Sequence, residues 1–324
     1  MNASTGGVGL SGVAGVLPPR QHSLGELAAA GLLSSTPQAL NALGFERARI
    51  CDARYLPEDL VLDAAGMALS EAGLHASEVN LLVWASARPE SHVRPAHPEE
   101  PPSGALMQGF RYNSAWLQHS LGLHNAEVMG VAQQGCSTMF SALRVARAVL
   151  LAERGRQHAL CVGLDVLPAG APREILYNVI SDAACAVVVS RGCSEERWLG
   201  YRQLSRGYYW DPSASGPEIV AGYFPTAKAV IEQLLAEHAL APGDVDVVVP
   251  TGVSRASWEI LLRLVGIPED RLHQGLPSFG HTITSDSFIY LQDLRRGGRV
   301  RRGSRLLLFT YGFGSSWCAL LLEH

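Results

Sequence analysis

The sequence predicts an α/β protein of two similar halves, stacked as α/β/α/β/α layers around mixed central sheets. Short valine- and leucine-rich runs that are apolar on both faces alternate with helical runs along the chain. Such runs are typical of central strands that are covered by helices on both sides. The order of elements in the first half recurs in the second half. This duplication predicts two units, residues 1–200 and residues 201–324.

The spacing of apolar residues places the individual elements. We predict strands at 81–85, 159–164, 184–189, 246–250, 305–310 and 317–322. We predict helices at 63–73, 137–154, 226–238, 255–265 and 286–296. The run 137–154 is apolar on nearly every face, so we expect this helix to be buried between layers.

The first half carries a proline-rich insertion at 87–104 that the second half lacks. Insertions of this kind map to surface loops, which either connect elements or shape a substrate entrance or a subunit contact. His92 and His97 lie in the insertion, and we expect them to be exposed loop residues rather than metal ligands.

Composition and charge exclude several classes of protein. The chain has 324 residues, of which 47% are hydrophobic, and a formal net charge of −4. It can bury a large core, and it lacks the electrostatic signature of a nucleic-acid-binding protein. No basic residue precedes Arg20 and no apolar run approaches the roughly 18–20 residues that cross a bilayer, so we expect neither a signal peptide nor a membrane contact. The six scattered cysteines predict reduced thiols in a cytoplasmic protein and no metal site.

Cys136 is the candidate nucleophile. A β-like run and a glycine turn lead to this cysteine at the start of the helix 137–154, where unpaired amides and the helix dipole stabilise a thiolate. The alternative is a small core residue, which is the interpretation that we keep for the other five cysteines. His281 holds the matching place in the second half, because a glycine precedes it and a helix follows it. If the halves pack about a pseudo-two-fold axis, the thiol and the imidazole face one pocket.

The sequence resembles the ketoacyl synthase III group of the thiolase fold over essentially its whole length. The resemblance rests on GCSTMFSALRVARAVLLAERGRQHALCVGLDVL, ISDAACAVVVS, TSDSF, LLLFTYGFGSSWCALLL and GFERAR (44–49). It implies a homodimer in which Cys136 takes an acyl group from a coenzyme A or carrier-protein thioester. It also implies a pantetheine tunnel that leads to the thiol, and no permanently bound cofactor.

Two positions depart from the pattern of that group. Ketoacyl synthase III enzymes have a His in a segment resembling PHQAN and an Asn in a segment resembling GNTSAAS. Here Thr251, in PTGVS, stands at the position of the His, and His281, in GHTITSD, stands at the position of the Asn. The family pair donates hydrogen bonds to the enolate that forms when a malonyl group loses carbon dioxide. Because threonine is a poorer donor, we predict that this chain does not catalyse decarboxylative condensation.

Asp286 completes a Cys–His–carboxylate set, since it follows His281 by five residues. This set is sufficient for acyl transfer, with the imidazole activating an incoming hydroxyl, amine or thiol. The pattern resembles the ketosynthase-III-like acyltransferases of antibiotic pathways, which move an acyl group without condensing it. The alternatives are a structural histidine and a helix N-cap role for Asp286.

The predicted oxyanion hole consists of the backbone N–H groups of Cys136 and Phe313. Phe313 stands in YGFGSS, which resembles the glycine-rich turn of the family. A tight turn between the last two strands explains the same glycines. Asp182, in ISDAAC, resembles a family aspartate and is predicted to be architectural.

Donor recognition departs from the family as well. Gln38 and Ala42 stand where the family has a tryptophan for adenine and an arginine for the phosphates. The missing ring and guanidinium favour an acyl carrier protein over coenzyme A as donor, although coenzyme A stays open. Arg173 and the aromatic segment GYYWDP (207–212), which includes Tyr209, are candidates for the pocket entrance, with a surface loop as the alternative. Thr251 is a candidate pocket residue.

The sequence therefore predicts an acyltransferase of secondary metabolism. It would move an acyl group from a carrier-protein or coenzyme A thioester, through an acyl-enzyme on Cys136, to a small-molecule or carrier acceptor. Two alternatives stay open: a condensing synthase in which His281 alone supports the enolate, and a catalytically silent subunit of a heterodimer. The basic cluster at 295–303 is interpreted as a solvated turn, with docking of an acidic carrier protein as its alternative.

Overall fold

The computed structural model describes residues 7–88, 110–193, 195–273 and 280–324. Apart from residues 87 and 88, the proline-rich insertion lies outside the described residues, as do the predictions for His92 and His97.

The elements alternate along the chain in the manner expected of an α/β fold. The strands are β1 (Val8–Val16), β2 (Gln21–Ser23), β3 (Arg47–Arg49), β4 (Leu81–Ala85), β5 (Glu127–Val131), β6 (His158–Asp165), β7 (Glu174–Ile175), β8 (Asn178–Val179), β9 (Ala183–Arg191), β10 (Glu196–Ser205), β11 (Val247–Val249), β12 (Arg305–Gly312) and β13 (Ser316–Glu323). The α-helices are α1 (Leu24–Ala29), α2 (Pro37–Ala42), α3 (Pro57–Glu71), α5 (Asn113–Ser120), α6 (Thr138–Ala152), α7 (Gly216–Glu237), α8 (Arg255–Val265) and α10 (Asp286–Arg296). The 3₁₀ turns are η1 (Ala76–Glu78), η3 (Gly135–Ser137), η4 (Gly207–Tyr209), η5 (Pro242–Asp244), η6 (Glu269–Arg271) and η7 (Ile283–Ser285).

Within the described residues, nine strands form one mixed sheet in the order β11-β12-β13-β10-β1-β9-β6-β4-β5. Reading outward from the centre, β1, β9, β6 and β4 of one half correspond to β10, β13, β12 and β11 of the other. The halves join where β1 pairs with β10 at Gly9↔Arg197 and Leu10↔Glu196. The predicted mixed α/β fold is confirmed, although the two predicted sheets are continuous. The predicted boundary at residue 200 falls inside β10, and the division into halves stays a prediction.

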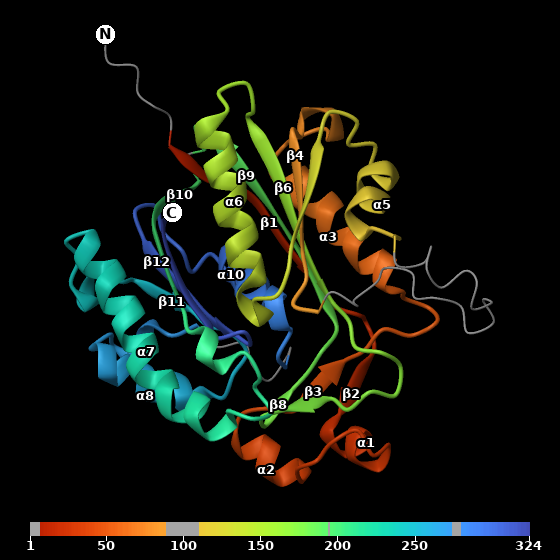
Figure 1. Ribbon diagram of the computed structural model, residues 1–324, viewed down its shortest axis with the longest axis vertical. Coiled ribbons are helices and arrows are strands. Elements are labelled where there is room, and N and C mark those ends of the chain that lie inside the picture. The colour runs from red at the N-terminus through yellow and green to blue at the C-terminus, as the bar shows by residue number, and fades with distance from the viewer. Residues whose placement is uncertain (1–6, 89–109, 194, 274–279) are drawn as a thin grey trace.

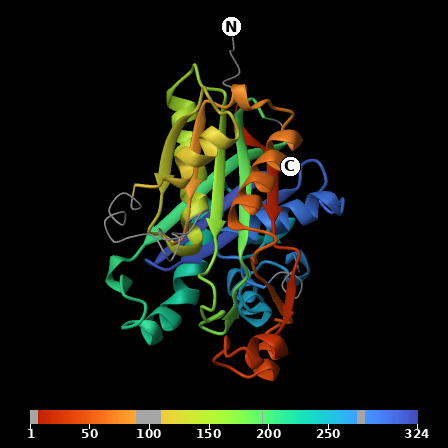
Figure 2. The same cartoon turned by 90° about the vertical axis from the view of Figure 1, so that its right-hand side faces the viewer.

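The helices form three layers around the strands (Figure 1). The central layer is α6 and α10, whose apolar side chains share one core with strands of both halves. Helix α3 covers the outer face of the first half, and α7 and α8 cover the outer face of the second half. A small cap of α1, α2, β2 and β3 lies beyond one end of the sheet, as the two views of Figures 1 and 2 agree. Because α6 and α10 share the middle layer, their N-terminal turns are brought together.

One segment is more apolar than the sequence analysis allowed. Gly135–Ala152, which contains α6, is long and apolar enough to cross a membrane by length and composition, so the statement that no run approaches this length was wrong. Half of this segment is buried inside the protein, in line with the prediction that this helix lies between layers.

Strand β1 was not predicted from the sequence. Its sequence, VGLSGVAGV, is interrupted by glycines, which weaken the pattern of a strand. Gly15 shows why one of them is needed, because a Cβ at this position would lie 2.3 Å from the side chain of Ile289 in α10. The glycine thus lets the central helix pack closely on the sheet.

Candidate active site

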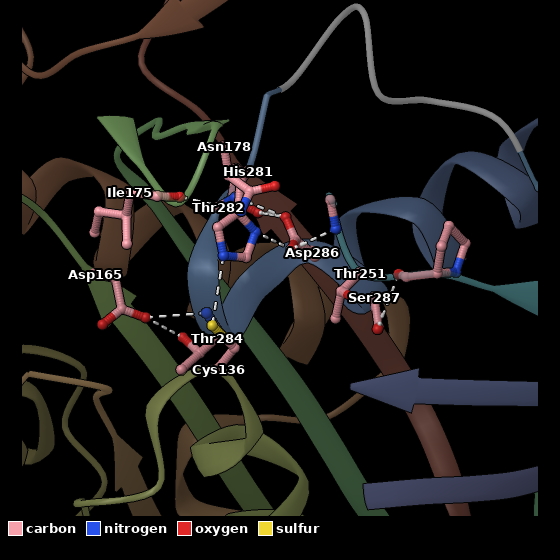
Figure 3. A network of polar contacts seen from close by, with 12 residues as sticks. Cys136, Asp165, Ile175, Asn178, Thr251, His281, Thr282, Thr284, Asp286 and Ser287 are labelled. Carbon is pink, nitrogen blue, oxygen red and sulfur yellow. Dashed lines mark hydrogen bonds and ion pairs between the residues drawn. The ribbon is translucent and has the colours of Figure 1, made fainter. Parts of the chain in front are cut away.

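Cys136 and His281 lie side by side at the N-terminal turns of the central helices. Cys136 belongs to η3, directly before α6, and His281 lies just before η7 and α10. The Cys136 Sγ is 3.4 Å from the His281 Nε2 (Figure 3). The thiol and the imidazole are therefore within hydrogen-bond reach of each other.

The backbone of His281 is fixed by a neighbouring segment of the first half. His281 donates its backbone N–H to the carbonyl of Val179 at 2.8 Å, and Ser181 donates to the carbonyl of His281 at 2.8 Å. Ile180 and His281 thus form an isolated parallel bridge. This bridge holds the imidazole at the junction of the two halves.

Asp286 binds the other nitrogen of the imidazole. Its Oδ2 lies 2.6 Å from the His281 Nδ1 and 2.6 Å from the backbone nitrogen of Gly252. Its Oδ1 accepts from the backbone nitrogen and the hydroxyl of Thr282 at 2.6 and 2.7 Å. Asp286 is the first residue of α10, and Ser285 occupies the N-cap position. The carboxylate therefore orients the imidazole rather than capping the helix.

The surroundings of His281 favour its protonated form. Burial alone would lower the pKa of His281, but the negative charges of Asp286 and Cys136 and their hydrogen bonds raise the pKa well above 6.5. The side chain is buried, with 7% of its surface exposed. The imidazole is thus a better proton acceptor than an isolated histidine.

A second buried carboxylate, Asp165, holds the turn that follows His281. Its Oδ2 accepts from the backbone nitrogen of Thr284 at 3.1 Å and from the Thr284 hydroxyl, and its Oδ1 accepts from the backbone nitrogen of Ala87 at 3.0 Å. Burial raises the pKa of Asp165 to about 6 against these hydrogen bonds. The sequence analysis missed this residue, although an aspartate at the end of the apolar run ALCVGL was a usable signal.

The loop after β12 packs directly on the turn of Cys136. A Cβ on Gly312 would lie 1.8 Å from the carbonyl oxygen of Gln134. Gly135 has a φ of +52°, and a Cβ there would lie 2.3 Å from the backbone nitrogen of Phe313. These glycines let the two backbones approach each other closely. The roles of the Cys136 and Phe313 amides as oxyanion donors stay a prediction, with both residues lining one cavity.

The cavity in front of Cys136 has a volume of about 480 Å³. His281, Thr251 and Phe313 line it together with Cys136. The wall beside Cys136 is an apolar cluster of Leu167, Ile180 and Ile283, against which the cysteine packs. The cavity is therefore open to both groups of the dyad and is apolar on one side.

Two predicted entrance residues lie elsewhere. Arg173 is buried, with 2% of its surface exposed, and forms an ion pair with Asp182, so its charge is already used. Asp182 also accepts from the backbone nitrogens of Cys51 and Leu167 at 2.9 and 3.0 Å, which accounts for an architectural role. Of the predicted segment 207–212, Trp210 and Pro212 line the cavity, whereas Tyr209 and Arg173 are not among its described lining residues.

Across the described residues, no group of three or more His, Cys, Asp and Glu side chains is arranged to hold a metal ion.

The chain is similar to known proteins of one family. Residues 235–324 match the model of the 3-oxoacyl-[acyl-carrier-protein] synthase III C terminal. A β-ketoacyl-[acyl-carrier-protein] synthase III of Sphingopyxis alaskensis is 25% identical, with 97% of this chain and 98% of the relative covered. A 3-oxoacyl-[acyl-carrier-protein] synthase III of Aquifex aeolicus has a crystal structure that matches with a TM-score of 0.82 at 21% identity, covering 98% of this chain and 100% of that chain. Over nearly its whole length the chain is therefore similar to ketoacyl synthase III enzymes, and it shares their fold.

The fold is shared with an acyltransferase as well. The solved structure of the acyltransferase ChlB3 matches this chain with a TM-score of 0.81 at 21% identity, covering 98% of this chain and 97% of that chain. At this identity the likeness shows the fold alone. Because synthases and an acyltransferase share this fold, the fold alone does not assign the reaction.

Proposed function

We propose that the protein is an acyltransferase that works through an acyl-enzyme on Cys136, without decarboxylative condensation. The observation that carries the proposal is the continuous chain from Asp286 through His281 to Cys136, with separations of 2.6 and 3.4 Å. A carboxylate, an imidazole and a thiol in this order are the parts needed for nucleophilic acyl transfer.

In the first step, the Cys136 thiolate attacks the carbonyl carbon of a donor thioester. The resulting oxyanion is stabilised by the amides of Cys136 and Phe313. When the intermediate collapses, the carbon–sulfur bond to the donor breaks and the leaving thiolate takes the proton from the His281 imidazolium. The products of this step are the acyl-enzyme, a neutral imidazole and the free thiol of the donor.

Acylation itself prepares His281 for the second step. The charge of the thiolate contributes to the raised pKa of His281, and that contribution disappears when the sulfur is acylated. The imidazole is then neutral and accepts the proton of an incoming hydroxyl, amine or thiol as this group attacks the acyl carbon. Expulsion of the Cys136 thiolate releases the acylated acceptor and restores the resting pair.

Thr251 argues against condensation. The resemblance places a second hydrogen-bond donor of the family, a histidine, at this position, which here lines the cavity as a threonine. An enolate needs preorganised donors, and a neutral hydroxyl is a weaker one than an imidazole. The competing candidate is a condensing enzyme in which His281 alone supports the enolate. It is favoured by the names of the relatives, which are synthases.

We further propose that the donor is a carrier-protein thioester rather than coenzyme A. A second cavity of about 310 Å³ adjoins the first, since Leu176, Tyr223 and Tyr311 line both. Leu43 also lines the second cavity and directly follows α2, which carries Gln38 and Ala42. None of the described residues that line the second cavity is lysine or arginine. Such a passage suits a neutral pantetheine arm better than nucleotide phosphates.

The basic cluster at 295–303 does not support carrier docking. It precedes β12, and the loop at the cavity follows this strand of eight residues. At roughly 3.3 Å per residue, the cluster is separated from the loop by about 26 Å. Arg295 and Arg299 are also engaged in ion pairs with Glu71 and Asp293. We therefore keep the interpretation of a solvated turn.

We propose a cytoplasmic homodimer that acts in secondary metabolism on a small-molecule or carrier acceptor. The edge strand β5 supports self-association, because Glu127, Met129 and Gly130 are exposed at the rim of the sheet. Exposed edges of this kind pair readily with a second strand. The metabolic setting follows the resemblance of the Cys–His–Asp set to acyltransferases of antibiotic pathways.

Intact-mass spectrometry after incubation with acyl-carrier-protein thioesters tests the proposal. We expect a stoichiometric acyl adduct that is absent from Cys136→Ala and present in the matched variant Cys193→Ala, and transfer to an added nucleophile. Steady release of carbon dioxide from a malonyl thioester, coupled to a β-keto product, would establish condensation instead. A purified protein that forms no adduct and turns over only with a partner chain would be a silent subunit.

A further inference from the structure

The turn after His281 holds an isoleucine in a conformation that isoleucine rarely adopts. Ile283 has a φ of 57°. This left-handed region is uncommon for any residue with a side chain and is a genuine outlier for a β-branched one. A strained residue persists only where its surroundings over-determine it, and such residues gather at functional sites.

Hydrogen bonds on both sides of Ile283 hold the turn in place. Thr282 donates its backbone N–H and its hydroxyl to Asp286. Thr284 donates its backbone N–H and its hydroxyl to Asp165. Ile283 thus lies between two threonines that are each bound twice to a buried carboxylate. We call Thr282, Thr284, Asp165 and Asp286 the carboxylate clamp.

The clamp places the side chain of Ile283 in the cavity wall beside the nucleophile. Ile283 packs with Leu167 and Ile180 in the apolar cluster that contacts Cys136, and all four residues line the cavity. An acyl group on the Cys136 sulfur therefore adjoins this cluster. Leu167 and Ile180 come from other segments, whereas Ile283 is fixed on the same turn as the catalytic histidine.

We propose that Ile283 is a specificity-determining residue that limits the length of the acyl group on Cys136, and that the carboxylate clamp holds it there. The proposal rests on the acyl-enzyme of the proposed function. The substrate class is a short aliphatic acyl group, because a charged or strongly polar group would lose its hydration against this wall without gaining partners.

The test uses a series of straight-chain acyl pantetheine thioesters, from acetyl to dodecanoyl, with adduct formation on Cys136 followed by intact mass. Replacing isoleucine in Ile283→Ala opens the wall. Each methylene that becomes buried raises the rate by about four-fold, so the preference for a chain longer by a pair of methylenes should rise by on the order of ten-fold. Ile283→Val, which trims less and keeps β-branching, should shift the preference in the same direction by less. Ile260→Ala, the same substitution at an exposed isoleucine of α8 outside both cavities, should keep the wild-type profile.

The outcomes separate the two proposals. If the wild type forms no adduct with any thioester, the acyl-enzyme itself is refuted. If the wild type reacts and both Ile283 variants keep its chain-length profile, the inference alone is overturned. The melting temperature tests the backbone strain at Ile283 separately, because glycine adopts a positive φ freely. Ile283→Gly should melt at or above the temperature of Ile283→Ala, and a clearly higher melting temperature of the alanine variant would contradict the strained turn.

Discussion

The turn of Cys136 and the turn of His281 hold equivalent places in the two halves, but they are fixed by different chemistry. The turn of Cys136 is closed by neutral groups: the hydroxyl of Ser137 donates to the carbonyl of Gln134 and that of Thr138 to the carbonyl of Gly135, both at 2.7 Å. The turn of His281 is held by two buried carboxylates instead.

This difference assigns the electrostatics of the site. Negative charge from Asp286 and Asp165 lies on the side of the imidazole, where it stabilises the cation. On the side of Cys136, the same charge would oppose a thiolate. One duplicated architecture thus supplies a neutral turn for the anion of the pair and an acidic turn for its cation. The predictions below disturb the acidic turn or the neutral one.

The largest effect is expected from Asp286→Asn, which removes the charge from the acidic turn while keeping its size. The imidazole loses its orientation and its electrostatic support, so kcat for acyl transfer should fall by about 10³- to 10⁴-fold. Steady-state kinetics measure the loss. Asp293→Asn, on the exposed side of the same helix α10, is the control and should retain wild-type kcat. A loss below about ten-fold in Asp286→Asn would remove Asp286 from the catalytic set.

A smaller effect is expected from Gly312→Ala, which disturbs the neutral turn. The new Cβ would overlap the carbonyl of Gln134, so the backbones at positions 312 and 134 must move apart. This movement should lower the free energy of unfolding by about 1–3 kcal/mol. Thermal and urea unfolding measure this change in stability. Gly66→Ala is the control, because Gly66 lies on the exposed face of α3 with open space around it, and alanine is the better helix former. Equal stability of the Gly312 variant and the wild type would contradict the close approach.

The smallest effect on activity is expected from Asp165→Asn, which weakens the acidic turn away from the imidazole. The amide nitrogen of the new asparagine cannot accept the hydrogen bonds that Thr284 donates to Asp165. We expect kcat to fall by about ten-fold, which corresponds to the loss of one such hydrogen bond.

The effect on stability depends on pH. Burial raises the pKa of Asp165 from 3.8 to about 6, so between these values the folded protein binds a proton that the unfolded chain has released. The stability contributed by this group therefore falls as pH rises, by about 3 kcal/mol in full. The wild type should lose this stability between pH 4.5 and 7, whereas Asp165→Asn should not. The free energy of unfolding of Asp165→Asn relative to that of the wild type should therefore rise across this range, as measured by urea unfolding. A difference between the two proteins that is independent of pH would show that Asp165 is not titrating in this range.

Much of the fold was predictable because local pattern and tertiary role agree. The bounds of α8 and α10 match the predicted helices residue for residue, since apolar spacing and end signals determine them. Strand β1 was missed because its glycines serve helix packing rather than strand propensity. Helix α7 begins at Gly216, before the predicted start at 226, and contains Pro225, which reads as a break in the sequence.

The site divides in the same way. Cys136, His281 and Asp286 lie together as predicted, because the repeat and the helix starts mark them, while their catalytic roles stay a prediction. Ile283 could not be found, since a positive φ at isoleucine has no sequence signal. The prediction of Arg173 at the entrance was wrong because its ion pair with Asp182, nine residues later, has no signal in the sequence.

The most direct test of the account is an NMR titration of the His281 imidazole in the wild type and in Cys136→Ala. The account predicts a pKa well above 6.5 in the wild type, because the thiolate and Asp286 both favour the cation, and a lower value once the sulfur is removed. The same downward shift is expected in the acyl-enzyme. A pKa that is at or below 6.5 in the wild type, or that is unchanged in Cys136→Ala, would contradict the claim that the two halves bring a thiolate and an imidazolium together.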